Sequence, residues 1–140
     1  MYTSLIANLV VNGVSESISE SKGKFIYVVN LVTKFGQTTN YTAKDHLDEI
    51  TKYAKKEPDF VFINSSKLPD DILEKYRLEN AFPVIDDLPN NQKNIVRGDF
   101  LASEIIKKHK GDILRRSLIR HDGYKISREI LNILNRYRHW

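Results

Sequence analysis

Residues 35–50 read FGQTTNYTAKDHLDEI and follow the apolar run KFIYVVNLV at residues 24–32. The run is rich in β-branched and aromatic side chains, a composition typical of a strand. In the stretch after it, apolar residues recur at helical spacing over residues 43–54, and Thr42 stands where an N-cap is needed. The junction therefore predicts a strand that passes through a turn into an amphipathic helix.

The rest of the chain alternates between the same two patterns. Expected strands are residues 4–11, 24–32, 59–66, 81–85 and 93–98, the last two as an antiparallel pair at a sheet edge. Expected helices are residues 43–54, 68–78 with Pro69 in the first position, 100–110 capped by Asp99, 112–121, and 127–140 capped by Ser127. Residues 12–23 fit a hairpin turn or a short helix, and the helix is favoured. This order predicts an α/β fold with helices on both faces of a mixed sheet.

The composition is that of an ordinary folded domain. The chain has 140 residues, of which 41% are hydrophobic and 29% are charged, and a single core of that size needs no disulfide or metal. It contains no cysteine, which excludes disulfides, thiolate metal sites and thiol redox chemistry. With no signal-peptide pattern and no long apolar run, we expect a cytoplasmic or nuclear protein that is neither secreted nor inserted in a membrane.

The order of elements over about the first 112 residues resembles the thioredoxin fold. Matching the helix that contains Leu47 to the family's redox helix places Gln37, Thr38, Thr39 and Asn40 on its C-x-x-C motif. Pro83, preceded by Phe82, then takes the position of the family's cis-proline. Both cysteines are replaced, Gly36 stands where an aromatic residue is usual, and Leu31 stands where redox members often bury an acid. The resemblance therefore implies a redox-inactive member with two parts, a thioredoxin-like domain at 1–111 and a basic helical extension at 112–140 packed on or next to it.

The resemblance also implies a binding function. A helix N-terminus with exposed donors beside an X-Pro segment suits an extended peptide, so the expected protein-binding residues are Gln37, Thr38, Thr39, Asn40, Phe82 and Pro83. The alternative is that the hydroxyl and amide side chains only cap the following helix. From this we predict a non-catalytic adaptor that acts through a protein partner and needs no cofactor.

A search for catalytic or metal-binding patterns supports the same expectation. The four histidines have no spacing typical of a metal site. The pairs Asp70-Asp71 and Asp86-Asp87 have no companion that would separate their pKa values, and helix-start and turn chemistry explain them. The sequence contains no Gly-rich phosphate loop and no nucleophile elbow. We therefore expect no metal and no enzymatic activity.

The C-terminal third carries the positive charge. Residues 95–140 hold 11 Lys and Arg against 5 Asp and Glu. The possible nucleic-acid contacts are Arg115, Arg116, Arg120, Lys125, Arg128, Arg136 and Arg138. The competing interpretation is that these cations solvate amphipathic helices that dock on the sheet or on a second protomer, giving a homo-oligomer. Membrane binding is not expected, because the apolar stripes are narrow.

Overall fold

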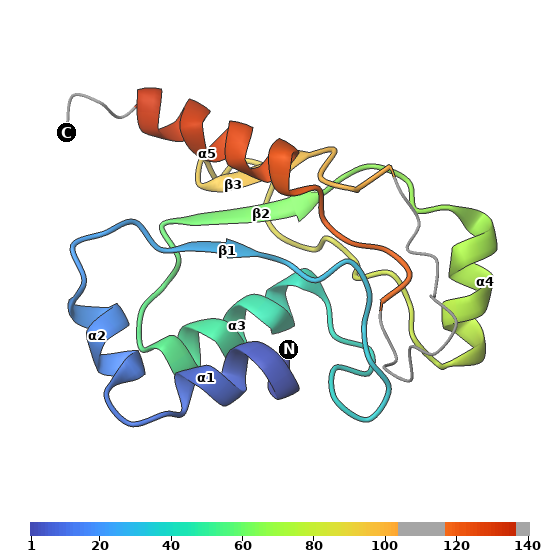
Figure 1. The fold of residues 1–140 in the computed structure, drawn as a ribbon, viewed down its shortest axis with the longest axis horizontal. Helices are drawn as coiled ribbons and strands as arrows, with labels where there is room; N and C mark the ends of the chain where they lie inside the picture. The colour runs from blue at the N-terminus through green and yellow to red at the C-terminus, as the bar shows by residue number, and fades with distance from the viewer. Residues whose placement is uncertain (104–116, 137–140) are drawn as a thin grey trace, which may run out of the picture.

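The structure, a computed structural model, describes residues 1–103 and 117–136. These residues form a layered α/β unit (Figure 1). The helical elements are the π-helical turn η1 (Tyr2–Ile6), α1 (Ala7–Leu9), α2 (Val14–Glu20), α3 (Ala43–Ala54), α4 (Asp70–Leu78) and α5 (Gly123–Arg136). The strands are β1 (Ile26–Val28), β2 (Phe60–Asn64) and β3 (Ile95–Gly98). The predicted α/β class is confirmed.

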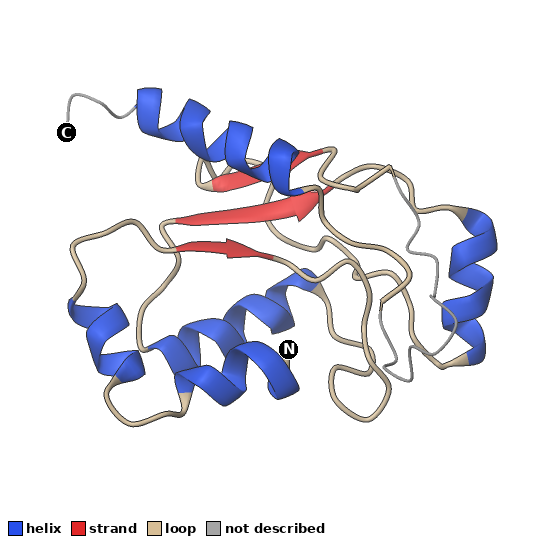
Figure 2. Cartoon of the chain, in the orientation of Figure 1, coloured by secondary structure: helices blue, strands red, loops and turns tan. Residues whose placement is uncertain are grey.

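The three strands form one sheet in the order β1-β2-β3, and both pairings are parallel (Figure 2). Val61 of β2 is paired with Tyr27 on one side and with Ile95 on the other. Parallel neighbours require a crossover connection, and α3 provides it between β1 and β2. The sheet is therefore parallel in the described residues, where the sequence predicted a mixed one.

β2 is buried on both faces, and its side chains divide the core in two. Phe60 and Phe62 pack with Phe100 and Ile133 on one face, while Val61 and Ile63 belong to a second cluster on the other. Alternation of side chains along a strand produces this division. A strand covered on both faces is nearly continuous in apolar residues, as the letters FVFI show.

Helices cover both faces of the sheet (Figure 1). On one face α5 presents Ile126, Ile130 and Ile133, spaced at one turn of helix, to the phenylalanine cluster. Within that cluster the rings of Phe62 and Phe100 stack with centroids 5.4 Å apart. On the other face α3 and the N-terminal helices supply the second cluster. The extension expected to be basic thus contributes an apolar face to the core.

α3 begins as predicted, at a capping box. The Thr42 hydroxyl accepts a hydrogen bond from the Asp45 backbone N–H at 3.3 Å, and the Asp45 carboxylate accepts one from the Thr42 N–H at 2.9 Å. Two N–H groups that a helix start leaves without partners are satisfied in this way. Thr42 as N-cap is therefore confirmed, as are α2, the strand at 59–66 and a helix over 68–78, in which Pro69 precedes the first helical residue.

The prediction of a strand at residues 4–11 is wrong, because the segment is helical through η1 and α1. Its β-branched composition favoured a strand. Met1 and Ile6, however, are buried in the core cluster, and Tyr2 and Leu9 pack against it. These positions share one face of a helix, and the burial of that face outweighs strand propensity.

The predicted antiparallel pair of residues 81–85 and 93–98 is also wrong. β3 is parallel to β2, and residues 81–85 instead lie beside the end of β1, where Pro83 forms an isolated antiparallel bridge with Val32. Backbone hydrogen bonds from Thr33 to Phe82 and from Val84 to Leu31 hold the two segments together. An X-Pro segment lacks one donor, which suits it to a short bridge rather than to a ladder.

The C-terminal region differs from the prediction in the residues that the structure describes. Residues 100–103 and 117–121 are not helical, and Leu101 forms an antiparallel bridge with His121. α5 starts at Gly123, since the Asp122 carboxylate accepts hydrogen bonds from the N–H groups of Tyr124 and Lys125. Ser127, the predicted cap, lies inside the helix and donates to the Gly123 carbonyl. Residues 104–116, with the predicted domain boundary at 111, are outside the described residues. No helix in the described ranges is long and apolar enough to cross a membrane.

A substitution at Gly98 can test the packing between β3 and the phenylalanine cluster. A Cβ at this position would lie 2.9 Å from Cζ of the buried Phe100 ring. We expect Gly98→Ala to lower the free energy of unfolding by about 1–3 kcal/mol, measured by urea denaturation, because the stacked ring must shift. The control is Gly123→Ala, where a Cβ meets nothing within 4 Å. An unchanged midpoint for Gly98→Ala would contradict this packing.

The ion pair between Arg97 on β3 and Asp86 gives a pH prediction. The guanidinium donates to both carboxylate oxygens, at 2.6 and 3.1 Å, and also to the Leu88 carbonyl. Arg97 holds the pKa of Asp86 below its usual value. The stabilisation is therefore complete above the unfolded-state pKa of about 4 and is lost as the pH falls through the lower folded-state pKa.

We expect Asp86→Asn to cost about 1–2 kcal/mol at pH 7 in urea denaturation. The difference from the native chain should shrink as the pH is lowered below about 4. Asp71→Asn, at an exposed position in the first turn of α4, is the control for loss of one negative charge. A destabilisation that is independent of pH would show that the charge of Asp86 has no role.

Candidate ligand-binding site at the carboxyl edge of the sheet

The carboxyl ends of the parallel strands meet at one edge of the sheet. β1 continues into Asn30 and Leu31, and β2 ends at Asn64 and continues into Ser66 and Lys67. α4 follows beyond this edge and does not cover a face of the sheet (Figure 1). In open α/β sheets ligands bind outside the carboxyl ends of the strands, so the cavities at this edge are the first candidates for a site.

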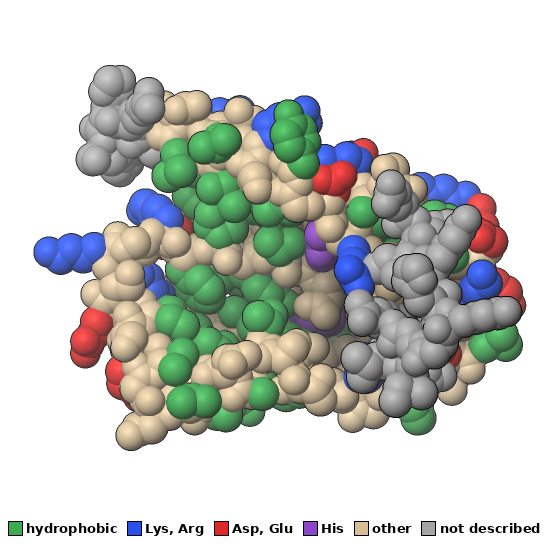
Figure 3. Space-filling view, viewed as in Figure 1, with side chains coloured by type: hydrophobic (Ala, Val, Ile, Leu, Met, Phe, Trp, Pro, Cys, Tyr) green, Lys and Arg blue, Asp and Glu red, His purple; other side chains and the backbone are tan. Residues whose placement is uncertain are grey.

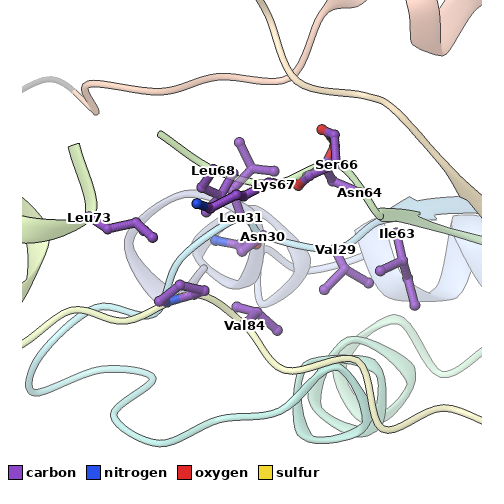
Figure 4. A pocket seen from close by; sticks show the side chains of 11 residues that line it. Val29, Asn30, Leu31, Ile63, Asn64, Ser66, Lys67, Leu68, Leu73 and Val84 are labelled. Atoms are coloured by element: carbon purple, nitrogen blue, oxygen red, sulfur yellow. Dashed lines mark hydrogen bonds between the residues drawn. The ribbon is translucent and has the colours of Figure 1, made fainter. Parts of the chain in front are cut away.

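A small cavity of about 280 Å³ lies between the ends of β1 and β2 (Figure 4). Its lining comes from the end of β1, the end of β2 with the loop after it, Leu73 of α4, and Pro83 with Val84. Asn30, Ser66 and Lys67 bring polar groups to a wall that is otherwise largely apolar. The cavity is near the lower limit of roughly 300 Å³ that is common for small-molecule sites.

Hydrogen bonds fix one side of the small cavity. The Asn64 carboxamide oxygen accepts from the Ser66 hydroxyl at 2.8 Å and from the Phe100 N–H at 3.0 Å, while its NH₂ donates to the Ser66 carbonyl. Asn64 is thereby committed to shaping the loop. The Asn30 carboxamide, in contrast, forms no hydrogen bond within the described residues and lines the cavity with its donors and acceptor available.

A larger cavity of about 810 Å³ shares Asn30 and Leu31 with the small one. Its other walls are formed by η1, the segment Val32–Phe35, the end of α4 and residues 117–121. Two cations, Lys34 and Arg120, and one acidic residue, Glu79, are among its described lining residues. Neither Lys34 nor Arg120 forms an ion pair within the described chain. Positive charge is therefore in excess among the described residues that line the large cavity.

Backbone pairing fixes the position of Arg120 and the residue after it. The Arg120 carbonyl accepts from the Ala102 N–H at 2.9 Å, and the Asp122 N–H donates to the Phe100 carbonyl at 2.8 Å. On the other side of the segment, the Tyr76 hydroxyl accepts from the Leu118 N–H at 2.9 Å. A guanidinium anchored at its backbone loses less freedom when it binds an anion.

His121 lies in the same cavity. Burial lowers its pKa, although a hydrogen bond to the Val29 backbone acts in the opposite direction. Its Nε2 atom is buried and has no hydrogen-bond partner among the described residues. Figure 3 shows histidine side chains in the hollow between α5 and the N-terminal helices, next to Lys or Arg side chains. An unpartnered buried nitrogen is costly unless a ligand or water satisfies it.

His46 has similar properties but a different setting. It is completely buried on α3, its Nδ1 atom is 2.8 Å from the Thr42 carbonyl oxygen, and its ring meets Tyr41 edge to face. Burial lowers its pKa too. Because it lines neither cavity, its role is in the core.

The residues of the predicted peptide site are only partly assembled. Gln37, Thr38, Thr39 and Asn40 lie in turns that end before Tyr41, so they do not form the start of α3. Thr38 is buried, and its hydroxyl accepts from the Lys34 N–H at 2.9 Å, which gives it a structural role. Pro83 lines the small cavity, and Phe82 is 42% exposed. The described residues contain no cis peptide bond. Peptide binding by this set stays a prediction.

The residues of the predicted basic surface are distributed over different settings. Lys125 donates to the Asp99 carboxylate and to the Leu101 carbonyl, and so ties α5 to the preceding strand segment. Arg128 and Arg136 are exposed on α5, whereas Arg120 lines the large cavity. Arg115, Arg116 and Arg138 lie outside the described residues.

Sequence reasoning missed Asn30, Lys34 and His121 as members of one site. A signal was present, because Asn30 is a polar residue within the apolar run at residues 24–32 and lies two residues after the end of β1. That signal carries weight only when the strands are known to be parallel, and the sequence had predicted a mixed sheet.

Comparison with known proteins decides the family. A family model described as 2-phospho-L-lactate transferase CofD matches residues 1–101. The chain belongs to this family. It is 39% identical over its whole length to a putative gluconeogenesis factor of Thermotoga maritima, and 30% identical, over 96% of its length, to the gluconeogenesis factor of Bacillus subtilis. It spans 42% and 40% of these two relatives.

A solved structure agrees with the family. The crystal structure of a UPF0052 family protein from Bacillus halodurans superposes with a TM-score of 0.74 at 30% identity, over 93% of this chain and 39% of that one. The CofD family thus provides the structural neighbour of this chain.

These findings correct three predictions. The resemblance to the thioredoxin family is wrong, because the family match is to CofD proteins. The predicted functions, a redox-inactive adaptor or a nucleic-acid-binding protein, are wrong because the relatives are gluconeogenesis factors of a transferase family. The expectation of no enzymatic activity is contradicted by the match to a family described as a transferase. Strand-helix alternation is shared by many α/β families and did not distinguish them.

Proposed function

We propose that this chain forms part of a CofD-type transferase and binds a phosphorylated carboxylic acid of the 2-phospho-L-lactate type at the carboxyl edge of the sheet. Because the chain spans about two-fifths of its curated relatives, the proposal concerns its contribution to the site. The family supplies the reaction class, group transfer, and the name of the phosphorylated acid. The two cavities at the carboxyl edge of the sheet support this location for the binding site.

The observation that carries the proposal is the charge of the large cavity. Lys34 and Arg120 line it without a carboxylate partner in the described chain. Several other cations in the described chain are paired, as in Lys67 with Asp70 or Arg97 with Asp86. Unpaired cations in a concave site attract and retain anions.

The side-chain types also fit. A guanidinium can bind a phosphate or carboxylate through two parallel hydrogen bonds, whereas an ammonium acts as a point charge. The Asn30 carboxamide, which lines both cavities, can donate to a phosphate oxygen and accept from a hydroxyl. The phosphate and the carboxylate of one ligand could thus each bind one of the two cations, Arg120 and Lys34, and both could accept a hydrogen bond from Asn30.

The test is anion binding by the full chain. We expect 2-phospho-L-lactate to bind, and Arg120→Gln to weaken it about 10- to 100-fold in isothermal titration calorimetry, because one charge-assisted contact is worth about 1.5–3 kcal/mol. Lys34→Gln should weaken binding in the same direction.

The matched control is Arg128→Gln, which removes the same charge from the exposed surface of α5. It should change the affinity less than about twofold at physiological salt. Equal losses for Arg120→Gln and Arg128→Gln would show that binding depends on net charge and not on the cavity, which would refute the proposed site.

A further inference from the structure

His121 is a group of the large cavity to which the proposed function has given no task. Its backbone is held by the bridge to Leu101, and its ring lies beside the end of β1 through the contact with the Val29 backbone. The Nε2 atom is buried and has no hydrogen-bond partner in the part of the chain that the structure describes. His121 lines the cavity together with Lys34 and Arg120, the two cations that define the anion site.

We propose that His121 takes up a proton when an anion binds in the large cavity, so that its imidazolium becomes a third cation of the anion site. The inference rests on the proposed function, since it needs the anion site formed by Lys34 and Arg120. It assigns to that site a preference for ligands with more than one negative charge, such as a phosphate dianion that also carries a carboxylate.

The electrostatics of the free cavity keep the ring neutral. Burial penalises the charged form, and the cations Lys34 and Arg120 line the same cavity. Glu79 is the acidic residue among the described lining residues, and the Tyr76 hydroxyl is occupied by the N–H of Leu118. A bound dianion would reverse this balance by placing negative charge in the cavity that the His121 ring lines, and Nε2 would then be protonated.

The direction of the pH dependence follows from this balance. In the free chain the pKa of His121 is below its ordinary value of about 6.5, and the bound anion raises it. Binding therefore gains free energy from protonation below the bound-state pKa. The affinity for the anion should fall as the pH rises through the window between the two pKa values.

Sulfate is the sharpest probe, because it keeps its charge constant around neutral pH, whereas phosphate esters titrate there. We expect sulfate binding at pH 6.5–7 to take up about one proton or a large part of one, measured as the dependence of the calorimetric enthalpy on the ionisation enthalpy of the buffer. Met1 also lines the cavity, and burial lowers the pKa of its α-amino group. A variant must therefore identify the group that is protonated.

His121→Gln keeps a side chain of similar size with hydrogen-bonding capacity. It should still bind sulfate, about 3- to 30-fold more weakly, and should take up no proton. Uptake that persists in His121→Gln would overturn the inference and point to the Met1 amine. Sulfate binding by the native chain without proton uptake would also overturn it, while leaving the anion site intact.

Nitrogen-15 NMR of the histidine imidazoles can identify the protonated group in the native chain, without a substitution. Adding sulfate should raise the pKa of His121 by more than that of the core residue His46, which lines neither cavity but is influenced by the charge of the Met1 amine. If sulfate shifts the backbone signals of Asn30 and Arg120 but leaves the pKa of the His121 imidazole constant, the inference about His121 is refuted and the proposed anion site remains. If no signal at this edge moves with sulfate or with 2-phospho-L-lactate, the proposed function fails together with it.

Discussion

The structure depends on the burial of β2 on both of its faces. A strand with Phe60 and Phe62 on one side and Val61 and Ile63 on the other cannot be stable at a solvent boundary, so the chain must supply a layer for each face. α3 and the N-terminal helices form one layer and α5 forms the other. Because β2 pairs in parallel with both of its neighbours, all three strands end at the same edge, and the cavities are located there.

Local sequence signals predicted the elements in the first half of the chain where propensity and packing agree. The capping box at Thr42 and the continuous apolar letters of β2 are of this kind, and both are found where they were expected. At the N-terminus two signals conflict, because the β-branched composition favours a strand whereas the apolar residues recur at helical spacing. The packing of Met1 and Ile6 in the core stabilises the helix. Residues 117–121 depend on partners far away in sequence, which no local pattern reveals.

The candidate site was less accessible from the sequence than the fold. Its groups come from the ends of β1 and β2, from the loop at Lys34 and from the segment at Arg120, and these are brought together by pairings between distant segments. Arg120 was singled out as a basic residue, but for a nucleic-acid surface. The thioredoxin comparison placed attention on Gln37 and Asn40, which lie in turns whose hydroxyls and amides stabilise the loop. Only the family match separated two α/β folds with similar element order.

The central claim is that an anionic, phosphorylated ligand binds at the carboxyl edge of this sheet. The most direct measurement is a crystal structure of the full chain with 2-phospho-L-lactate. We expect density for the phosphate in the large cavity, within hydrogen-bonding distance of the Arg120 guanidinium and of Lys34 or Asn30. A ligand located away from the ends of β1 and β2, or an empty cavity at a ligand concentration that saturates binding in solution, would contradict it.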